Sequence, residues 1–337
     1  MIIPEAGYWV YFSGYPYQFI LRRLNSFLMA NHPTSISPSS PPKTSAWLLA
    51  IRPRTLPAAT APVVVGSGVA FLQNQFELLP ALAALMGALL LQIGANLAND
   101  VFDYHKGADT AQRLGPTRVT QAGLLTPQQV LIGMWVTFGL ASLAGAYLAW
   151  TAGWPVIAMG IASILAAIAY TGGPYPLGYN GLGEVFVFIF FGPVAVLGTY
   201  YVQALSISPL AIWSAVPVGL LITAILVVNN LRDIATDQAA GKRTLAVRLG
   251  ARATRLEYLI LVSIAYLLPA ILSLTGPVPW LANLVWLSLP MAVSMVNKVN
   301  TLTGRPLNSV LAGTGQLTLV HSFLYAAGLT LTRLFLY

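Results

Sequence analysis

Cysteine does not occur in this sequence, which excludes disulfides, thiol nucleophiles and cysteine-ligated metal sites. Charge is also scarce, because Asp, Glu, Lys and Arg make up 8% of the residues, against about 25% in a typical soluble domain. Apolar residues take their place, at 57% of the 337 positions. This balance excludes a soluble enzyme and indicates an integral membrane protein.

Apolar runs long enough to cross a bilayer recur along the chain, which favours helices over a β-barrel. Residues 119–183 and 185–231 contain no Asp, Glu, Lys or Arg, and each run is interrupted once or twice by Gly- or Pro-containing breaks. We expect two spans in each of the ranges 56–99, 119–183, 185–231 and 258–297, and one span in 306–332. The fold class expected is therefore an all-α membrane protein with nine transmembrane helices.

The basic residues lie almost entirely on one side of this nine-span topology. Sixteen of the seventeen Lys and Arg residues fall on that side, and Arg333 falls on the other. Cytoplasmic loops of membrane proteins carry an excess of Lys and Arg. We therefore expect a multi-pass protein of the cell membrane whose N-terminus and basic loops face the cytoplasm. This topology also accounts for the net charge of +8, so no nucleic-acid partner is expected.

The first 45 residues differ from the rest. A Tyr-rich stretch leads to Arg22 and Arg23, and a Ser/Pro-rich linker follows. Because the basic pair follows the apolar part, the segment does not match a signal peptide. We expect residues 1–45 to be an extension and residues 46–337 to be the functional domain. The extension is interpreted as disordered, as absent if translation starts at Met29, or as a short interfacial segment.

Five of the nine acidic residues gather in two clusters, each at the basic end of a predicted span. The first cluster comprises Asn96, Asp100, Asp103 and Asp109. The second cluster comprises Asn229, Asp233 and Asp237. Spacings of three and four residues place Asn96, Asp100 and Asp103 on one helix face, and the same holds for the second cluster. Carboxylates beside lipid-embedded helices are costly unless a cation compensates them.

A divalent metal with a phosphate group is the compensation that these residue types favour. Mg²⁺ takes one or two carboxylates plus substrate phosphate oxygens, and we expect Mn²⁺ to be able to replace it. Neighbouring basic residues suit the outer phosphate oxygens; these are Lys106, Arg113, Arg118, Arg232, Lys242 and Arg243. If the phosphate is a diphosphate on an allylic lipid, its departure leaves a carbocation that needs a dry, electron-rich pocket. The candidates for its aromatic wall are Tyr104, Tyr170, Tyr175 and Tyr179, which also fit an interfacial aromatic belt.

A secondary transporter that couples ions through intramembrane carboxylates is the alternative class. Transporter sites usually lie near the bilayer midplane on broken helices. Here both clusters lie at span ends and on one side of the membrane, which favours an enzyme.

Several stretches resemble the UbiA superfamily of intramembrane aromatic prenyltransferases, over about residues 46–335. They are residues 52–57, 96–100, 106–109, 115–118, 179–184, 229–233 and 241–250. The run 241–250 is similar to the branch of the family that acts on a naphthoate. The resemblance implies helices around a central cavity, capped by the cytoplasmic loops after helices two and six. It also implies Mg²⁺-dependent transfer of a polyprenyl group from its diphosphate to 1,4-dihydroxy-2-naphthoate with loss of the carboxylate, giving demethylmenaquinol for menaquinone biosynthesis.

The resemblance also assigns roles to residues. It implies that Asp100, Asp103, Asp233 and Asp237 bind the metal and the diphosphate, and that Asp109 completes the first motif. It implies diphosphate contacts at Asn96, Arg118, Lys242 and Arg243, to which we add Lys106, Asn229 and Arg232. Two alternatives stay open within the superfamily: a phytyl donor, or an acceptor such as 4-hydroxybenzoate, homogentisate, haem or chlorophyllide.

Overall fold

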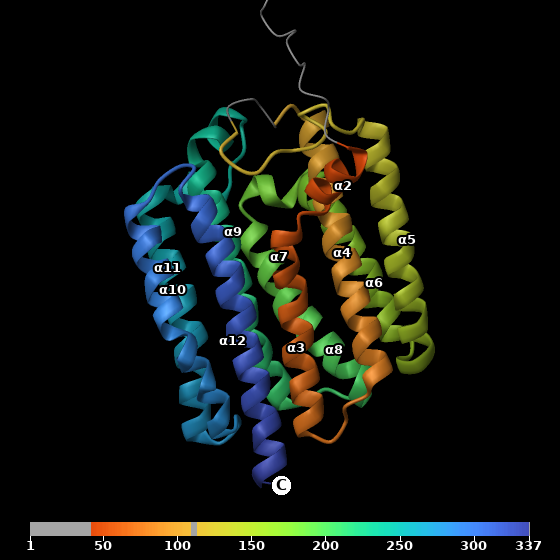
Figure 1. Ribbon diagram of the computed structural model, residues 1–337, viewed down its shortest axis with the longest axis vertical. Coiled ribbons are helices and arrows are strands. Elements are labelled where there is room, and N and C mark those ends of the chain that lie inside the picture. The colour runs from red at the N-terminus through yellow and green to blue at the C-terminus, as the bar shows by residue number, and fades with distance from the viewer. Residues whose placement is uncertain (1–41, 109–112, 337) are drawn as a thin grey trace, which may run out of the picture. The chain divides into compact units, whose positions relative to one another are not determined.

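The computed structural model describes residues 42–108 and 113–336, and within these ranges every regular element is a helix (Figure 1). Most of the predicted N-terminal extension, including Met29, lies outside the described residues, and so does Asp109. The elements are α2 (Lys43–Ile51), η1 (Pro53–Thr55), α3 (Leu56–Leu72), α4 (Leu78–His105), α5 (Pro127–Ala152), α6 (Trp154–Thr171), η2 (Leu177–Asn180), α7 (Gly183–Ile189), η3 (Phe190–Val194), α8 (Ala195–Ala204), α9 (Pro209–Ala239), α10 (Leu245–Thr275), η4 (Trp280–Ser288), α11 (Leu289–Thr301) and α12 (Leu307–Leu336).

The described residues contain nine helical segments that are long and apolar enough to cross a membrane, which confirms the predicted number of spans. Three of these segments are composite, because α2 with α3, α7 with α8, and η4 with α11 each form one span. The two spans expected in residues 119–183 are α5 and α6, which meet at a Gly- and Pro-containing break within residues 150–155. There Gly153 separates α5 from α6 with a φ of 85°, a left-handed conformation that glycine adopts without strain.

Polar residues at the helix starts satisfy backbone groups that a helix leaves unpaired. Thr126 and Gln129 form a capping box at the start of α5. Ser208 accepts a hydrogen bond of 3.1 Å from the amide of Ala211 at the start of α9, directly before Pro209. These caps explain why α5 and α9 begin where they do, directly after a polar residue.

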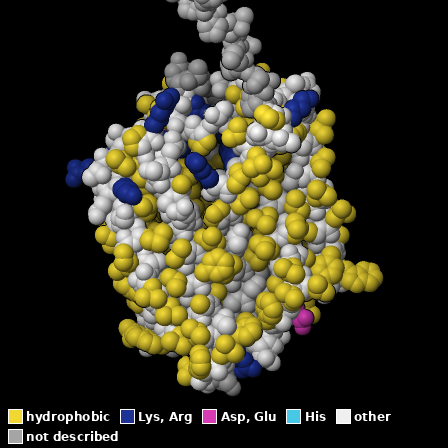
Figure 2. Space-filling view, in the orientation of Figure 1, with side chains coloured by type: hydrophobic (Ala, Val, Ile, Leu, Met, Phe, Trp, Pro, Cys, Tyr) yellow, Lys and Arg dark blue, Asp and Glu magenta, His cyan; other side chains and the backbone are white. Residues whose placement is uncertain are grey.

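The outer surface is apolar along the flanks and basic at one end. Figure 2 shows hydrophobic side chains covering the middle of the view and most Lys and Arg side chains gathered near the end that carries α2. Large apolar side chains are exposed on these flanks, including Leu143 at 69% and Trp150 at 90%. Such a surface suits lipid contact.

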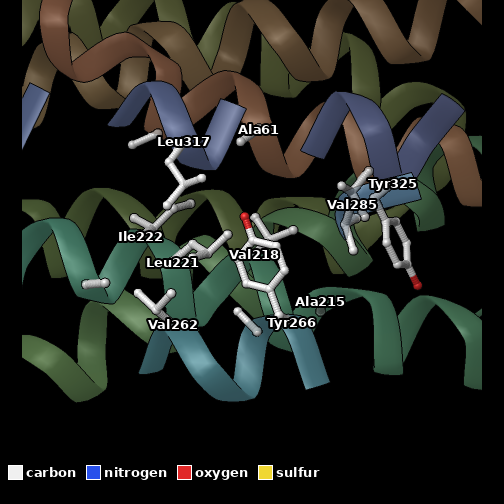
Figure 3. Packing of buried hydrophobic residues seen from close by; sticks show 14 of the residues in the cluster. Ala61, Ala215, Val218, Leu221, Ile222, Val262, Tyr266, Val285, Leu317 and Tyr325 are labelled. Atoms are coloured by element: carbon white, nitrogen blue, oxygen red, sulfur yellow. The ribbon is translucent and has the colours of Figure 1, made fainter. Parts of the chain in front are cut away.

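A packed core joins α3, α9, α10 and α12 (Figure 3). Val218, Leu221 and Leu317 are almost completely buried there. Hydroxyl pairs add links between elements: Tyr266 of α10 bonds to Ser288 of η4 at 2.6 Å, and Tyr325 of α12 bonds to Ser214 of α9 at 2.9 Å. Small residues and hydroxyl pairs of this kind hold membrane helices together. This half of the bundle is densely packed, and the cavity lies beside it, along α4, α5 and α6.

Candidate active site

A cavity of about 940 Å³ lies among α3, α4, α5, α6, α8 and α9. Both Ala84 and Asp103 of α4 line it, and the nineteen helical steps from one to the other correspond to about 28 Å of helix. Small and apolar residues line the part near Ala84, among them Gly145, Val156 and Gly160. Polar residues line the part near Asp103, and they are Asn96, Asn99, Arg118, Asn229, Asn230, Asp233, Asp237 and Lys242. The cavity is therefore long, with one polar end.

Asn96 ties α4 to the entry of α3. Its side-chain amide donates to the carbonyl of Ile51 and to the hydroxyl of Thr55, both at 2.9 Å. Between these residues Arg52 has a φ of 55°, a left-handed conformation that is uncommon outside glycine. The turn before Pro53 thus places the Arg52 guanidinium 3.6 Å from the Asp100 carboxylate.

Asp100 holds the loop that follows α4. Its two carboxylate oxygens accept hydrogen bonds from the backbone amides of Val119, at 3.2 Å, and Thr120, at 3.1 Å. The side chain is 1% exposed and is not among the residues that line the cavity. The three residues predicted to share one helix face therefore have different surroundings: Asn96 and Asp103 line the cavity, whereas Asp100 contacts the loop.

Asp103 carries the contacts that join the first cluster to the rest of the polar end. Arg118 donates to its carboxylate at 2.8 Å, and the hydroxyl of Tyr179 donates to it as well. Lys242 lies 3.7 Å away. Three loops, those after α4, α6 and α9, therefore meet at one carboxylate.

The second cluster is organised by Arg232. This guanidinium donates to Asp233 through Nε at 2.8 Å and to Asn229 through Nη2 at 2.8 Å. It also donates to Asn308 of α12 at 2.7 Å, and Asn308 donates to the carbonyl of Leu114 at 2.9 Å. Arg232 is buried and does not line the cavity. It thus orients the second cluster and links it to α12 and to the first loop.

Tyr179 lies between two lysines. The ammonium of Lys242 is 4.4 Å from the centre of the ring and that of Lys106 is 5.2 Å from it. Lys106 also donates to the carbonyl of Gly173 at 3.0 Å. Burial lowers the pKa of Lys106, and the charge of Lys242 lowers it further, while the carboxylate of Asp103 opposes both effects. Two lysine side chains therefore lie over one aromatic ring at the rim of the polar end.

The predicted site residues fall into three groups. The residues that line the cavity together are Asn96, Asp103, Arg113, Arg118, Asn229, Asp233, Asp237 and Lys242. Asp100, Arg232 and Lys106 contact these residues or their loops without lining it, and Arg243 is exposed. The backbone amide of Arg243 donates to the carbonyl of Tyr179 at 2.7 Å, so this residue fixes the loop through its main chain. Asp109 lies outside the described residues.

Two of the four candidate tyrosines line the cavity. Tyr170 and Tyr179 do so, whereas Tyr104 and Tyr175 are exposed. Asn99 lies in the first cluster's motif but was assigned no role, and it lines the cavity and accepts from the hydroxyl of Thr171 at 3.0 Å. Its position three residues after Asn96 was the available signal. Arg52 and Thr55 also line the cavity, and they lie within residues 52–57, a stretch that resembles the family but whose residues were assigned no role.

The donor set of the polar end consists of hard oxygens. Asp103, Asp233 and Asp237 present carboxylates to the cavity, and Asn96, Asn99 and Asn229 present amides. Within residues 42–108 and 113–336, no three His, Asp or Glu side chains form a group that holds a metal by themselves. Mg²⁺ typically takes only one or two carboxylates and completes its shell with phosphate oxygens and water. The residues present fit a metal that is bound together with a phosphate.

Comparison with known proteins agrees with this geometry. The chain is 43% identical over 290 residues to the 1,4-dihydroxy-2-naphthoate octaprenyltransferase of Mycobacterium tuberculosis, covering 86% of this chain and 98% of the relative. It is 32% identical to the 2-carboxy-1,4-naphthoquinone phytyltransferase of a Synechocystis species, covering 80% of this chain and 88% of the relative.

A solved structure shares the fold. It is a UbiA homologue from Archaeoglobus fulgidus bound to GPP and Mg²⁺, with a TM-score of 0.61 and 14% identity, covering 84% of this chain and 99% of that one. The model of the UbiA prenyltransferase family matches residues 59–306. The predicted resemblance is confirmed, and the chain belongs to the UbiA prenyltransferase family.

Proposed function

We propose that this protein transfers a polyprenyl group from its diphosphate to 1,4-dihydroxy-2-naphthoate, in the biosynthesis of menaquinone. The observation that carries the proposal is the long cavity with carboxylates and basic side chains at one end and apolar residues along the rest. The relative that bears the name of this reaction is matched over nearly its whole length. Membership of a prenyltransferase family also removes the ion-coupled transporter as an alternative.

The polar end is proposed to hold the diphosphate. Arg118 and Lys242 line the cavity and are the basic side chains closest to Asp103. Asp103, Asp233 and Asp237 would hold Mg²⁺, and Asp100 and Asp109 stay predicted ligands. When bound, the metal would offset the charge that builds up on the diphosphate as its bond to the allylic carbon breaks.

The remainder of the cavity is proposed to hold the prenyl chain and the reacting carbon. Tyr170, Phe186 and Phe190 line it and offer electron-rich rings to an allylic cation. Burial among apolar residues keeps water away from that cation, so that the naphthoate carbon captures it and the carboxylate leaves as CO₂. The new bond is carbon to carbon, and diphosphate carries away the electron pair of the broken bond.

The proposed location is the cell membrane, with the polar end facing the cytoplasm. The described Lys and Arg residues are concentrated near this end (Figure 2). Water-soluble naphthoate, Mg²⁺ and released diphosphate would then exchange with the cytoplasm, while the prenyl chain stays among apolar side chains.

A polyprenyl donor is favoured over phytyl. The relative that bears the octaprenyl name is the more similar, at 43% against 32% for the relative that bears the phytyl name. The experiment is to incubate the purified protein in lipid nanodiscs with Mg²⁺ and a panel of donors and acceptors, and to identify products by mass. The donors are octaprenyl, geranyl and phytyl diphosphate, and the acceptors are 1,4-dihydroxy-2-naphthoate, 4-hydroxybenzoate and homogentisate. We expect a decarboxylated product from the naphthoate with octaprenyl diphosphate. Transfer to 4-hydroxybenzoate or homogentisate in its place would contradict the proposal.

A further inference from the structure

The carboxylates of the polar end are already compensated by basic side chains of the protein. Asp103 pairs with Arg118 at 2.8 Å, and Asp233 receives two hydrogen bonds from Arg232. Asp100 lies 3.6 Å from Arg52. A metal that enters this site therefore competes with cations that are part of the chain.

Lys242 occupies the position where this competition is most direct. Its ammonium lies 3.7 Å from Asp103 of the first cluster and 3.7 Å from Asp237 of the second cluster. All three side chains are largely buried, at 12% exposed for Lys242, 2% for Asp103 and 13% for Asp237. A single lysine thus bridges the two clusters across the polar end of the cavity.

The loop that carries Lys242 allows its side chain to leave this position. Lys242 follows Gly241, which has a φ of 73°, and precedes Thr244, which caps α10 through the amide of Val247. The backbone amide of Lys242 donates to the carbonyl of Asp237 at 2.9 Å, so the main chain is fixed. The ammonium sits on a flexible four-carbon stem. It can therefore move to a phosphate oxygen without any change in the loop.

A divalent metal bound to Asp103 and Asp237 would lie about 2.0–2.1 Å from their oxygens. Two cations at such short range in a buried site repel each other strongly. The ammonium and the metal therefore exclude one another from the gap between the clusters. A diphosphate relieves the conflict, because its oxygens accept the displaced ammonium.

We propose that Lys242 is a built-in counter-ion that occupies the gap between Asp103 and Asp237 in the free protein and moves to the diphosphate when the metal enters. The inference rests on the proposed function for the identity of the diphosphate. It makes the metal and the diphosphate bind cooperatively, because each removes the obstacle to the other. It also places one positive charge between two buried carboxylates in the free protein, which limits their repulsion.

The test measures binding of Mn²⁺ to the full chain in nanodiscs by electron paramagnetic resonance, without any diphosphate. Replacing Lys242 by a neutral residue, as Lys242→Gln or Lys242→Ala, is expected to tighten Mn²⁺ binding by roughly tenfold or more. Lys242→Arg keeps the charge and is expected to bind Mn²⁺ as weakly as the original chain. Lys298→Gln is the control, since Lys298 is an exposed lysine near the end of α11 that does not line the cavity. Its Mn²⁺ affinity is expected to stay within about twofold of the original.

A second readout uses thermal unfolding. Mn²⁺ is expected to raise the unfolding temperature of Lys242→Gln more than that of the original chain, because a ligand stabilises the folded form more as its dissociation constant falls. Adding inorganic pyrophosphate is expected to tighten Mn²⁺ binding to the original chain and to reduce its difference from the neutral variants. Unchanged Mn²⁺ affinity in folded Lys242→Gln and Lys242→Ala would overturn the proposal. If the neutral Lys242 variants bind Mn²⁺ more tightly but the original chain does not prenylate the naphthoate, the proposed function alone is contradicted.

Discussion

Asp100 and Asp103 belong to one sequence motif but have different roles in the structure. They are three residues apart on α4, yet Asp100 accepts from two backbone amides of the following loop and Asp103 faces the cavity. A carboxylate that accepts two amide hydrogen bonds is well suited to hold a loop in place. That loop supplies Arg118, which donates to Asp103. At the scale of the residue, loop position and cavity charge are therefore coupled.

This coupling predicts the effect of Asp100→Asn. The variant removes the negative charge that lies against two backbone amides and Arg52. A hydrogen bond to a charged group contributes about 1.5–3 kcal/mol to stability. We expect turnover to fall by roughly tenfold or more, and trypsin to cleave faster after Arg113 and Arg118. The control is Glu77→Gln, in an exposed loop at the other end of the bundle. If trypsin cleaves Asp100→Asn as slowly as Glu77→Gln, Asp100 does not hold the loop.

At the scale of the element, glycines allow pairs of helices to approach each other closely. A Cβ built on Gly328 of α12 would lie 2.0 Å from the carbonyl oxygen of Leu281 in η4, and one on Gly66 of α3 would lie 2.6 Å from the carbonyl oxygen of Val196 in α8. Gly192 of η3 likewise lies against Gly219 of α9. This last contact accompanies a π-helical segment, and such segments often occur at functional sites. Glycine thus positions the helices whose aromatic residues line the cavity.

Gly328→Ala is expected to destabilise the bundle. The added methyl meets backbone atoms, which cannot rotate away, and overpacking of this kind costs about 1–3 kcal/mol. Thermal unfolding in nanodiscs should therefore begin at a lower temperature. The matched control is Gly139→Ala of α5, where the added Cβ meets no atom within 4 Å. Equal unfolding temperatures for the two variants would contradict the packing of α12 against η4.

The small residues of α5 and α6 predict a limit on donor length. Gly160 lines the apolar part of the cavity, and its added Cβ would meet open space. Gly160→Phe is expected to fill that space and to lower turnover of octaprenyl diphosphate roughly tenfold relative to dimethylallyl diphosphate. Competition between the two donors, followed by mass analysis, measures the ratio. An unchanged ratio would place the prenyl chain elsewhere.

At the scale of the whole molecule, the spans follow from composition and the loop contacts do not. Nine spans were predictable because a lipid bilayer requires about twenty apolar residues per helix. The two clusters were predictable because their spacing matches helical periodicity. The links from Arg232 to Asn308 and from Tyr179 to Asp103 join residues 76 positions apart. The first depends on how α9 packs beside α12 and the second on the path of the segment after α6, and the sequence has no periodic signal for either.

Neighbours in sequence also differ in ways that no pattern indicates. Lys242 and Arg243 both belong to the basic run after α9, and both were predicted to contact the diphosphate. The structure directs Lys242 into the cavity, while Arg243 is exposed and contributes its backbone amide. The turn at Gly241, with its φ of 73°, decides which of the two side chains faces inward.

The distribution of charge predicts the orientation of the bundle. The chain contains no cysteine, so single cysteines report one position each. Gln238→Cys lies at the polar end and Gln75→Cys in the loop between α3 and α4, and both positions are exposed. We expect a membrane-impermeant maleimide to label Gln238→Cys only in inverted vesicles and Gln75→Cys only in intact spheroplasts. The reverse pattern would place the polar end outside the cytoplasm.

The most direct test of the account is prenylation of 1,4-dihydroxy-2-naphthoate by the purified protein and by two variants, one from each cluster. Asp103→Ala and Asp233→Ala each remove a carboxylate that lines the cavity. With octaprenyl diphosphate and Mg²⁺, we expect the original chain to form the decarboxylated prenyl product. We expect each variant to lose roughly 100-fold or more of this activity while remaining folded in nanodiscs. Near-normal turnover in either folded variant would contradict a single site built from both clusters.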